Sequence, residues 1–169
     1  FLAFEELLVT HPEWVGRVVF AASVYPSRES LPDYQAYAVE TDEVVARINR
    51  RWSTSQWTPI HLDTDDSFPR SVALLRRADV MLVNPVRDGL NLVAKEGAAV
   101  NERNAVLLLS REAGAFDELG SHAVPVNPFD VAGTASALHL ALSMDADEKG
   151  RRSVALSAAA GKRTPADWL

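Results

Sequence analysis

The chain has 169 residues, of which 47% are apolar and 24% charged, and it contains no cysteine. This size and balance are typical of one globular domain that buries roughly 70% of its unfolded surface, and the lack of cysteine excludes a disulfide scaffold, a thiolate nucleophile and a zinc-thiolate site. The net charge of −6 argues against nucleic acid as a partner, because binding to a phosphate backbone requires clustered, uncompensated Lys and Arg.

The beginning of the chain already shows apolar residues at helical spacing. Residues 1–8 carry this pattern without a capping residue in front, so the chain begins inside or just at a helix. They have no basic stretch of the kind that opens a signal peptide. No apolar run approaches the ~18 to 20 residues of a membrane span. We therefore expect a cytoplasmic protein with no membrane partner.

Apolar, β-branched runs then alternate with stretches of helical periodicity. The predicted strands are residues 17–24, 58–62, 79–84, 105–110 and 123–127. Three of them, among them residues 105–110, are nearly continuous apolar runs, which favours strands buried on both faces. The predicted helices are residues 33–52, 68–77, 91–100, 115–119, 131–143 and 145–160. This alternation with short links predicts an α/β fold with a doubly wound parallel sheet. The expected apolar face of the helix at 33–52 consists of Tyr34, Tyr37, Ala38, Val44, Val45 and Ile48.

The C-terminus shows the start of another helix. Thr164 and Pro165 fit the capping residue and the first residue of a helix that then has no body. No linker, repeat or low-complexity tract divides the chain. We expect residues 1–169 to be a single domain that is truncated at both ends.

The strongest candidate site lies at residues 84–96. A predicted strand ends there, a polar loop follows in which Gly89 is able to adopt a positive φ, and a helix begins near Asn91. This geometry directs backbone N–H groups and the positive end of the helix towards a phosphate or diphosphate. The carboxylates of Asp88 and Glu96 suit the hydroxyl groups of a sugar and of a ribose. The same pattern also occurs as a plain connection between a strand and a helix.

The sequence lacks the residue patterns of metal-dependent, hydrolytic, phosphate-transferring and dinucleotide-binding enzymes. The four histidines show no metal-ligand spacing, and the sequence contains no nucleophile elbow, P-loop or G-x-G-x-x-G motif. We therefore expect neither a metal nor another cofactor.

The run DVMLVNPVRDGLNLVAKE at residues 79–96 resembles the donor-site segment of the trehalose-6-phosphate synthases, retaining glycosyltransferases of family twenty. Further segments resemble that family in the same order: ASVYPSR at 22–28 with the later pair Ile48-Asn49, LLSREAGA at 108–115 with the later pair Glu118-Leu119, and VNPFD at 126–130. The resemblance implies the C-terminal, donor-binding half of an enzyme with two facing Rossmann-like domains, the GT-B type.

Carried over position by position, the resemblance implies a role for each residue of the site. Asp88 would bind glucose hydroxyl groups of the donor and serve catalysis. The residues implied in binding the nucleotide sugar are Gly89, Leu90, Asn91, Leu92, Val93, Ala94, Lys95 and Glu96. Glu96 would hold the ribose hydroxyls, whereas Lys95 also fits a surface lysine of the helix and its role stays open. The segment at residues 110–115 fits a wall of the cleft, and Gly114 before a short helix would allow the backbone to come close to the ligand. Arg28 would bind the acceptor phosphate, although by itself it also fits a solvated turn arginine.

The activity that the resemblance implies is transfer of glucose from UDP-glucose, or another nucleotide-glucose, to glucose 6-phosphate, giving trehalose 6-phosphate. The partner within the same protein would be an N-terminal acceptor domain. An Arg and a Lys that neutralise the donor diphosphate in the family precede position 1, so we expect this chain alone to be inactive. The alternatives are a glucosylglycerol-phosphate synthase, a pseudo-glycosyltransferase or a non-catalytic nucleotide-sugar-binding module. The sequence leaves open whether the protein is a homo-oligomer.

Overall fold

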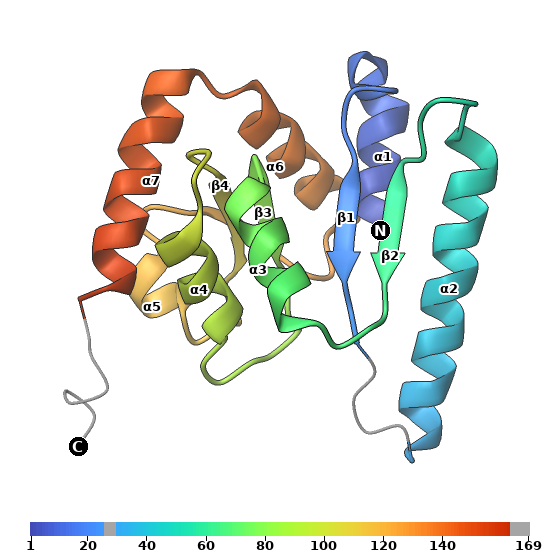
Figure 1. The fold of residues 1–169 in the computed structure, drawn as a ribbon, viewed down its shortest axis with the longest axis horizontal. Coiled ribbons are helices and arrows are strands. Elements are labelled where there is room, and N and C mark those ends of the chain that lie inside the picture. The colour runs from blue at the N-terminus through green and yellow to red at the C-terminus, as the bar shows by residue number, and fades with distance from the viewer. Residues whose placement is uncertain (26–29, 163–169) are drawn as a thin grey trace. The chain divides into compact units, whose positions relative to one another are not determined.

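The structure, a computed structural model, describes residues 1–25 and 30–162. The chain divides into two compact units, unit 1 at Phe1–Phe68 and unit 2 at Pro69–Leu169. Helices and strands alternate through both units, as Figure 1 shows. None of the helices within the described ranges is long and apolar enough to cross a membrane.

Unit 1 contains a two-stranded parallel sheet. Its elements are α1 (Leu2–Thr10), the 3-10 helix η1 (Pro12–Trp14), β1 (Phe20–Ser23), α2 (Pro32–Trp52) and β2 (Ile60–Asp63). The two strands pair in register from Phe20 opposite Ile60 to Ser23 opposite Asp63. Because parallel strands need a long crossover, α2 connects them.

The Ile48-Asn49 pair aligns α2 with β2. Ile48 is completely buried. The Asn49 side chain donates to the carbonyl of Ile60 over 2.9 Å and accepts from the N–H of the same residue over 3.0 Å. One amide thus satisfies both backbone groups at the start of the strand, which explains why this end of the helix requires an asparagine.

Two partly buried ion pairs connect α1 with α2. The Glu5 carboxylate is bonded to Arg47 over 2.8 Å and to Arg51 over 3.1 Å. Glu5 itself is only 8% exposed. Removing both arginines would leave a buried, uncompensated charge, so this cluster fixes the contact between the two helices.

The expected apolar face of α2 is buried only over its C-terminal half. Val45 and Ile48 are buried, whereas Tyr37 is 68% exposed. A helix of 21 residues is about 31 Å long. Strands of four residues extend only about 13 Å. The helix is therefore longer than the sheet of unit 1 can cover.

Unit 2 contains a three-stranded parallel sheet in the order β3-β4-β5. Its elements are α3 (Phe68–Arg77, which begins at the unit boundary), β3 (Val80–Val83), α4 (Leu92–Val100), β4 (Val106–Ser110), α5 (Phe116–Leu119), β5 (Val124–Val126), α6 (Val131–Ser143) and α7 (Ala146–Ala160). The central strand β4 is buried along its whole length, which explains its unbroken apolar sequence.

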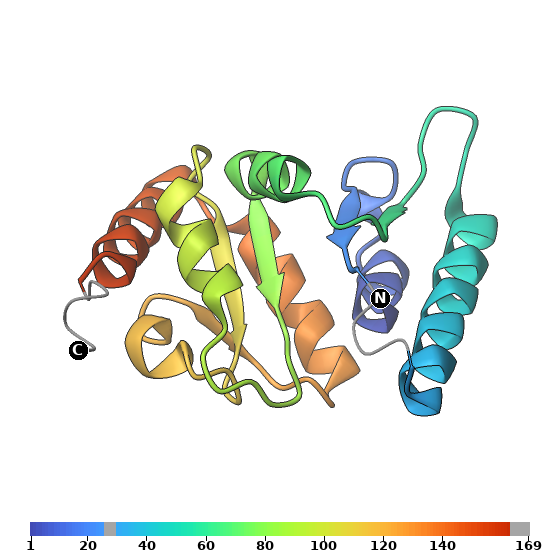
Figure 2. The ribbon, with the colours of Figure 1, turned by 60° about the horizontal axis from the view of Figure 1, so that its bottom comes forward.

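Helices cover both faces of this sheet. Leu107 and Leu109 of β4 belong to one core cluster with Ala94 of α4 and Leu156 of α7. The alternate residue Leu108 faces the opposite side, because side chains along a strand point to alternate faces. Figure 2 shows α4 and α6 on opposite sides of the strands.

The predicted α/β fold with parallel strands is confirmed, and each strand and helix predicted within residues 1–160 is present. The helix start predicted at Thr164 and Pro165 lies outside the described residues. The described strand pairs form two parallel sheets, one in each unit, where we expected one continuous sheet. That residues 1–169 make a single domain stays a prediction.

Candidate functional site

Two loops meet at the carboxyl ends of β3 and β4. The N–H of Asp88 donates to the carbonyl of Glu112 over 3.2 Å, and the N–H of Gly114 donates to the carbonyl of Asp88 over 2.8 Å. Asp88 and Ala113 thereby form an isolated parallel bridge beyond the ends of the strands. In a doubly wound sheet this edge is where ligands bind, so the bridge fixes a loop at the position of greatest functional interest.

The carboxylate of Asp88 organises its own loop. Its Oδ1 accepts from the N–H groups of Leu90 and Asn91 over 3.1 and 3.2 Å, and its Oδ2 accepts from Asn91 Nδ2 over 3.0 Å. The hydrogen bond from Leu90, followed by those from Asn91, lowers the pKa of Asp88 below its ordinary 3.8. Asp88 is therefore a carboxylate at neutral pH, and it acts as a hydrogen-bond acceptor rather than as a general acid.

These bonds also determine how the loop responds to acid. A carboxyl group whose pKa is lower in the folded state stabilises that state above its unfolded pKa. The stabilisation is lost as the pH falls through the lowered pKa of Asp88. The loop is thus fully held at neutral pH.

In the loop between β3 and α4, Asn91 adopts a left-handed backbone conformation, with a φ of 55°. We expected a positive φ at Gly89, but Gly89 does not have one. The Asn91 Oδ1 accepts from the N–H of Ala94 over 3.1 Å and caps α4. Asparagine tolerates this conformation because its side chain bonds locally to the backbone, so the sharp turn into α4 needs no glycine.

Replacing Asn91 by alanine should lower the free energy of unfolding by about 2 kcal/mol, because the cap is lost and an alanine must adopt a left-handed conformation. Asn91→Gly loses the cap without that strain and should cost about 1 kcal/mol less. Urea unfolding of both variants measures the difference. Equal losses would contradict a left-handed conformation at this position.

The amino end of α4 offers two backbone donors. Within the described residues, the N–H groups of Leu92 and Val93 find no acceptor. Those of Leu90 and Asn91 already donate to Asp88, so they are not the unpaired donors that we expected. An anion at this end would bind the first turn of α4, where the helix dipole also favours negative charge.

The predicted nucleotide-lining residues of α4 do not all face solvent. Leu92 and Val93 are 54% and 50% exposed, and Glu96 is exposed as well. Ala94 is completely buried in the core of unit 2. The Ala94 side chain therefore packs the helix against the sheet and does not line a ligand site.

Lys95 is not a surface lysine. Its Nζ lies 2.7 Å from Oε1 of Glu118, and the two side chains are 17% and 20% exposed. Glu118 belongs to α5, so this ion pair ties α4 to the segment that follows β4. Glu118 carries part of the family resemblance, but the sequence did not assign it a role in the site.

A hollow of about 240 Å³ lies between the two loops. Its lining consists of Arg87, Asp88, Gly89, Arg111, Glu112, Ala113, Gly114 and Asp117. The Arg111 guanidinium lies 5.6 Å from the centre of the Phe116 ring, which restrains this arginine. The hollow thus brings Asp88 together with residues of the β4–α5 connection, of which the sequence had singled out only Gly114.

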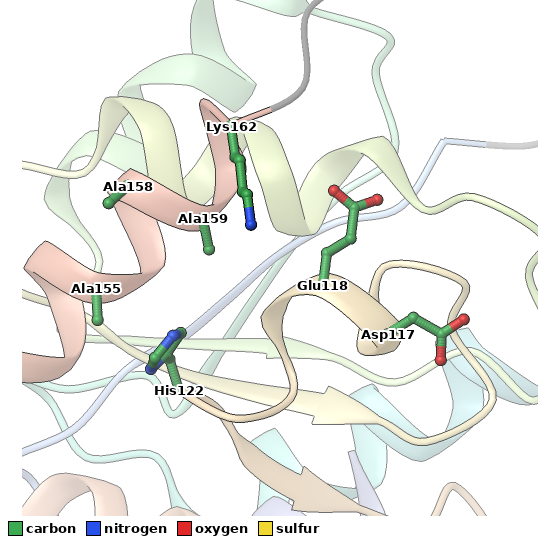
Figure 3. A pocket seen from close by; sticks show the side chains of 7 residues that line it. All are labelled: Asp117, Glu118, His122, Ala155, Ala158, Ala159 and Lys162. Carbon is green, nitrogen blue, oxygen red and sulfur yellow. The ribbon is translucent and has the colours of Figure 1, made fainter. Parts of the chain in front are cut away.

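A larger hollow of about 570 Å³ lies between α5 and α7. Figure 3 shows Glu118 and His122 on one side and Lys162 on the other. None of residues 88–96 lines it. Size therefore does not identify the candidate site, whereas the position of Asp88 at the carboxyl end of β3 does.

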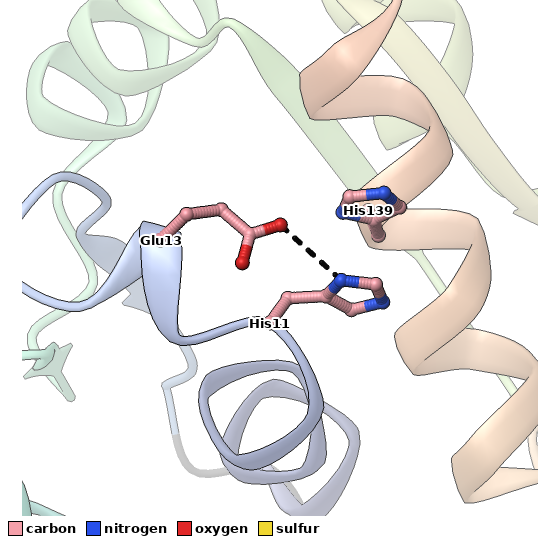
Figure 4. Close-up of side chains that lie close together, drawn as sticks. All are labelled: His11, Glu13 and His139. Atoms are coloured by element: carbon pink, nitrogen blue, oxygen red, sulfur yellow. Dashed lines mark ion pairs between the residues drawn. The ribbon is translucent and has the colours of Figure 1, made fainter.

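One of the four histidines, His11, has an acidic neighbour. In unit 1, His11 Nδ1 lies 3.3 Å from Oε1 of Glu13, and the dashed line in Figure 4 marks this pair. The two residues occupy the connection between α1 and η1. The contact is an ion pair only when the imidazole is protonated.

All predicted site residues except Arg28 lie in one continuous segment. Residues 88–96 form the loop after β3 and the first turns of α4 in unit 2. Arg28 lies outside the described residues.

Comparisons with known proteins identify a family for this chain. The profile of Glycosyltransferase family 20 matches residues 1–169. The bifunctional trehalose-6-phosphate synthase/phosphatase of Thermoproteus tenax is 44% identical over 168 residues, which make up 98% of this chain and 23% of that protein.

Two solved structures are similar in fold and sequence. One, described as trehalose-6-phosphate from E. coli bound with UDP-2-fluoro glucose, has a TM-score of 0.90 and is 34% identical. The other, a UDP-forming alpha,alpha-trehalose-phosphate synthase from Burkholderia xenovorans in complex with glucose-6-phosphate, has a TM-score of 0.90 and is 36% identical. Each match covers 95% of this chain and 36% of the other chain. This chain, matched along its whole length, belongs to glycosyltransferase family 20.

Proposed function

We propose that residues 1–169 are the donor-binding part, in the C-terminal half, of a retaining glucosyltransferase. The enzyme moves glucose from UDP-glucose to glucose 6-phosphate and forms trehalose 6-phosphate, and an N-terminal domain of the same protein supplies the acceptor site. The single observation that carries this proposal is the ionised Asp88 in a loop ordered by its own hydrogen bonds, next to the amino end of α4. The bound molecules of the two solved relatives support the choice of substrates.

Asp88 orients the glucose of the donor. Its carboxylate accepts three hydrogen bonds from Leu90 and Asn91. A carboxylate offers about four acceptor positions. Capacity for a sugar hydroxyl therefore remains, and the loop bonds hold the carboxylate in one orientation before the donor arrives. Because the carboxylate is already oriented, less conformational entropy is lost when the donor binds.

The amino end of α4 stabilises the diphosphate as it leaves. The N–H groups of Leu92 and Val93 donate to its oxygens, and the helix dipole adds a positive field. The diphosphate departs on the face from which the acceptor hydroxyl enters, so its oxygen can take the acceptor proton and retention follows. Asp88 and Glu96 hold the donor and do not attack it. Both units, in this proposal, belong to one Rossmann-like domain.

Residues 1–169 by themselves test the proposal that this chain binds the donor and that the N-terminal domain supplies the acceptor site. Residues 1–169 should bind UDP and UDP-glucose weakly in a calorimetric titration and should form no trehalose 6-phosphate, because the acceptor domain contributes to the reaction. Rapid product formation by the chain alone would contradict the proposal.

The complete protein tests the acceptor. With UDP-glucose as donor, glucose 6-phosphate should be consumed and glycerol 3-phosphate should not. The reverse preference would identify a glucosylglycerol-phosphate synthase. UDP binding without any transfer would identify a non-catalytic module.

A further inference from the structure

We propose that the segment after β4, residues 110–119, is a positioning element of the donor site. Gly114 and Glu118 act on the reaction through Asp88 and Lys95, without touching the donor themselves. This inference rests on the proposed function, because it concerns how the donor-binding loop and helix are held.

The first contact joins Gly114 to the Asp88 loop. A Cβ added at Gly114 would lie 2.0 Å from the carbonyl oxygen of Gly89 and 2.6 Å from its carbonyl carbon. Both atoms belong to the backbone, so they cannot move aside as the end of a flexible side chain could. The N–H of Gly114 donates to the carbonyl of Asp88 over 2.8 Å. Glycine at this position is therefore required for space, and it sets the distance between the two loops.

Residues 110–119 are themselves held in place by hydrogen bonds to the rest of unit 2 and within the segment. Ser110 is completely buried, and its Oγ accepts from the N–H of Glu112 over 3.1 Å. The N–H of Arg111 donates to the carbonyl of Val126 over 3.3 Å, which ties the segment to β5. A displacement of the Asp88 loop thus cannot be absorbed by movement of the segment without breaking these bonds.

The second contact joins Glu118 to Lys95 on α4. Their ion pair of 2.7 Å is largely shielded from solvent. Lys95 directly precedes Glu96, the residue proposed to bind ribose. The ion pair therefore fixes the rotation of α4 about its axis, and with it the direction of the Glu96 side chain.

Gly114→Ala in the complete protein tests the first contact. We expect kcat to fall about 10²-fold, because a displacement of about 1 Å in a positioning group has effects of this size. The affinity for UDP, which has no glucose, should stay within about threefold, since the change acts through the Asp88 carboxylate. Gly150→Ala is the matched control, because its added Cβ meets no atom within 4 Å. It should leave both values unchanged.

Glu118→Gln tests the second contact. It should weaken UDP binding about tenfold and change kcat less than about twofold, a coupling within the range of groups in direct contact. Lys95→Met should have the same effect, and the double variant should lose no more than either single variant. Glu102→Gln, which breaks the exposed pair with Arg76 in the same unit, is the control and should bind UDP normally.

A purely structural role would give a different result. Gly114→Ala and Glu118→Gln would then only lower the melting temperature. Measured well below their melting temperatures, their kcat per folded molecule and their UDP affinity would equal those of the two control variants. That result would overturn the proposal. If Gly114→Ala does not fold, the Glu118 series decides alone. Asp88→Asn distinguishes a failure of the positioning role from a failure of the proposed function. If Asp88→Asn also retains a normal kcat, the proposed donor-binding function is wrong. If Asp88→Asn loses most of its kcat while Gly114→Ala and Glu118→Gln behave normally, only the positioning role is overturned.

Discussion

Replacement of Asp88 by alanine in the complete protein is expected to lower kcat by about 10- to 150-fold, the equivalent of one charge-assisted hydrogen bond to a glucose hydroxyl. Interactions that strengthen as charge develops at the reacting carbon appear in the rate rather than in ground-state affinity. The affinity for UDP should change little by comparison. Steady-state kinetics and UDP titration of the same preparation measure both quantities.

The hydrogen bonds of Asp88 within its own loop require a second variant. Alanine removes the acceptors of Leu90 and Asn91, so part of its effect would come from a disordered loop. Asp88→Asn keeps an oxygen for both N–H groups and removes the charge and the acceptor of Asn91 Nδ2. It should retain most of the stability and still lose most of the turnover.

Asp79 provides the control for this experiment. It precedes β3, at the end of the strand opposite to the site, and its side chain is 61% exposed in a pair with Arg103. Asp79→Ala should leave kcat unchanged. If Asp88→Asn lowers the melting temperature but retains turnover per folded molecule, Asp88 orders the loop and does not bind the sugar.

Glu96→Gln is expected to weaken UDP-glucose binding by about 10- to 150-fold, because charge-assisted bonds to the ribose hydroxyls are worth about 1.5 to 3 kcal/mol. The melting temperature should stay the same. Glu96 is exposed, and its carboxylate forms no hydrogen bond or ion pair with the residues that the structure describes. Titration calorimetry with UDP and with UDP-glucose should show the same loss, since both contain the ribose.

The matched control is Glu40→Gln on the exposed part of α2, another helix carboxylate without a partner in the described ranges. It should affect neither UDP affinity nor stability. If Glu96→Gln behaves in the same way as this control, Glu96 is a helix-surface residue and the ribose assignment is wrong.

The sequence by itself predicted the order of the elements because each element depends on local patterns. The apolar run at residues 105–110 predicted a strand buried on both faces, and β4 is buried throughout. The helix at residues 131–143 matches α6, whose start is set by the capping side chain of Asp130. The candidate loop and the start of α4 near Asn91 were predicted on the same grounds, since capping and turn residues act within a few positions.

Tertiary structure decided the details of the site, because they depend on contacts between residues far apart in the sequence. Gly114 was expected to give the backbone room near a ligand, but the carbonyl of Gly89 occupies that space. Lys95 fitted a surface residue until Glu118, 23 positions later, was found beside it. The sequence pattern of α2 likewise could not show where the short sheet of unit 1 ends, which decides how much of the apolar face is buried. Periodicity and capping are properties of a segment, whereas these contacts arise only when segments pack against one another.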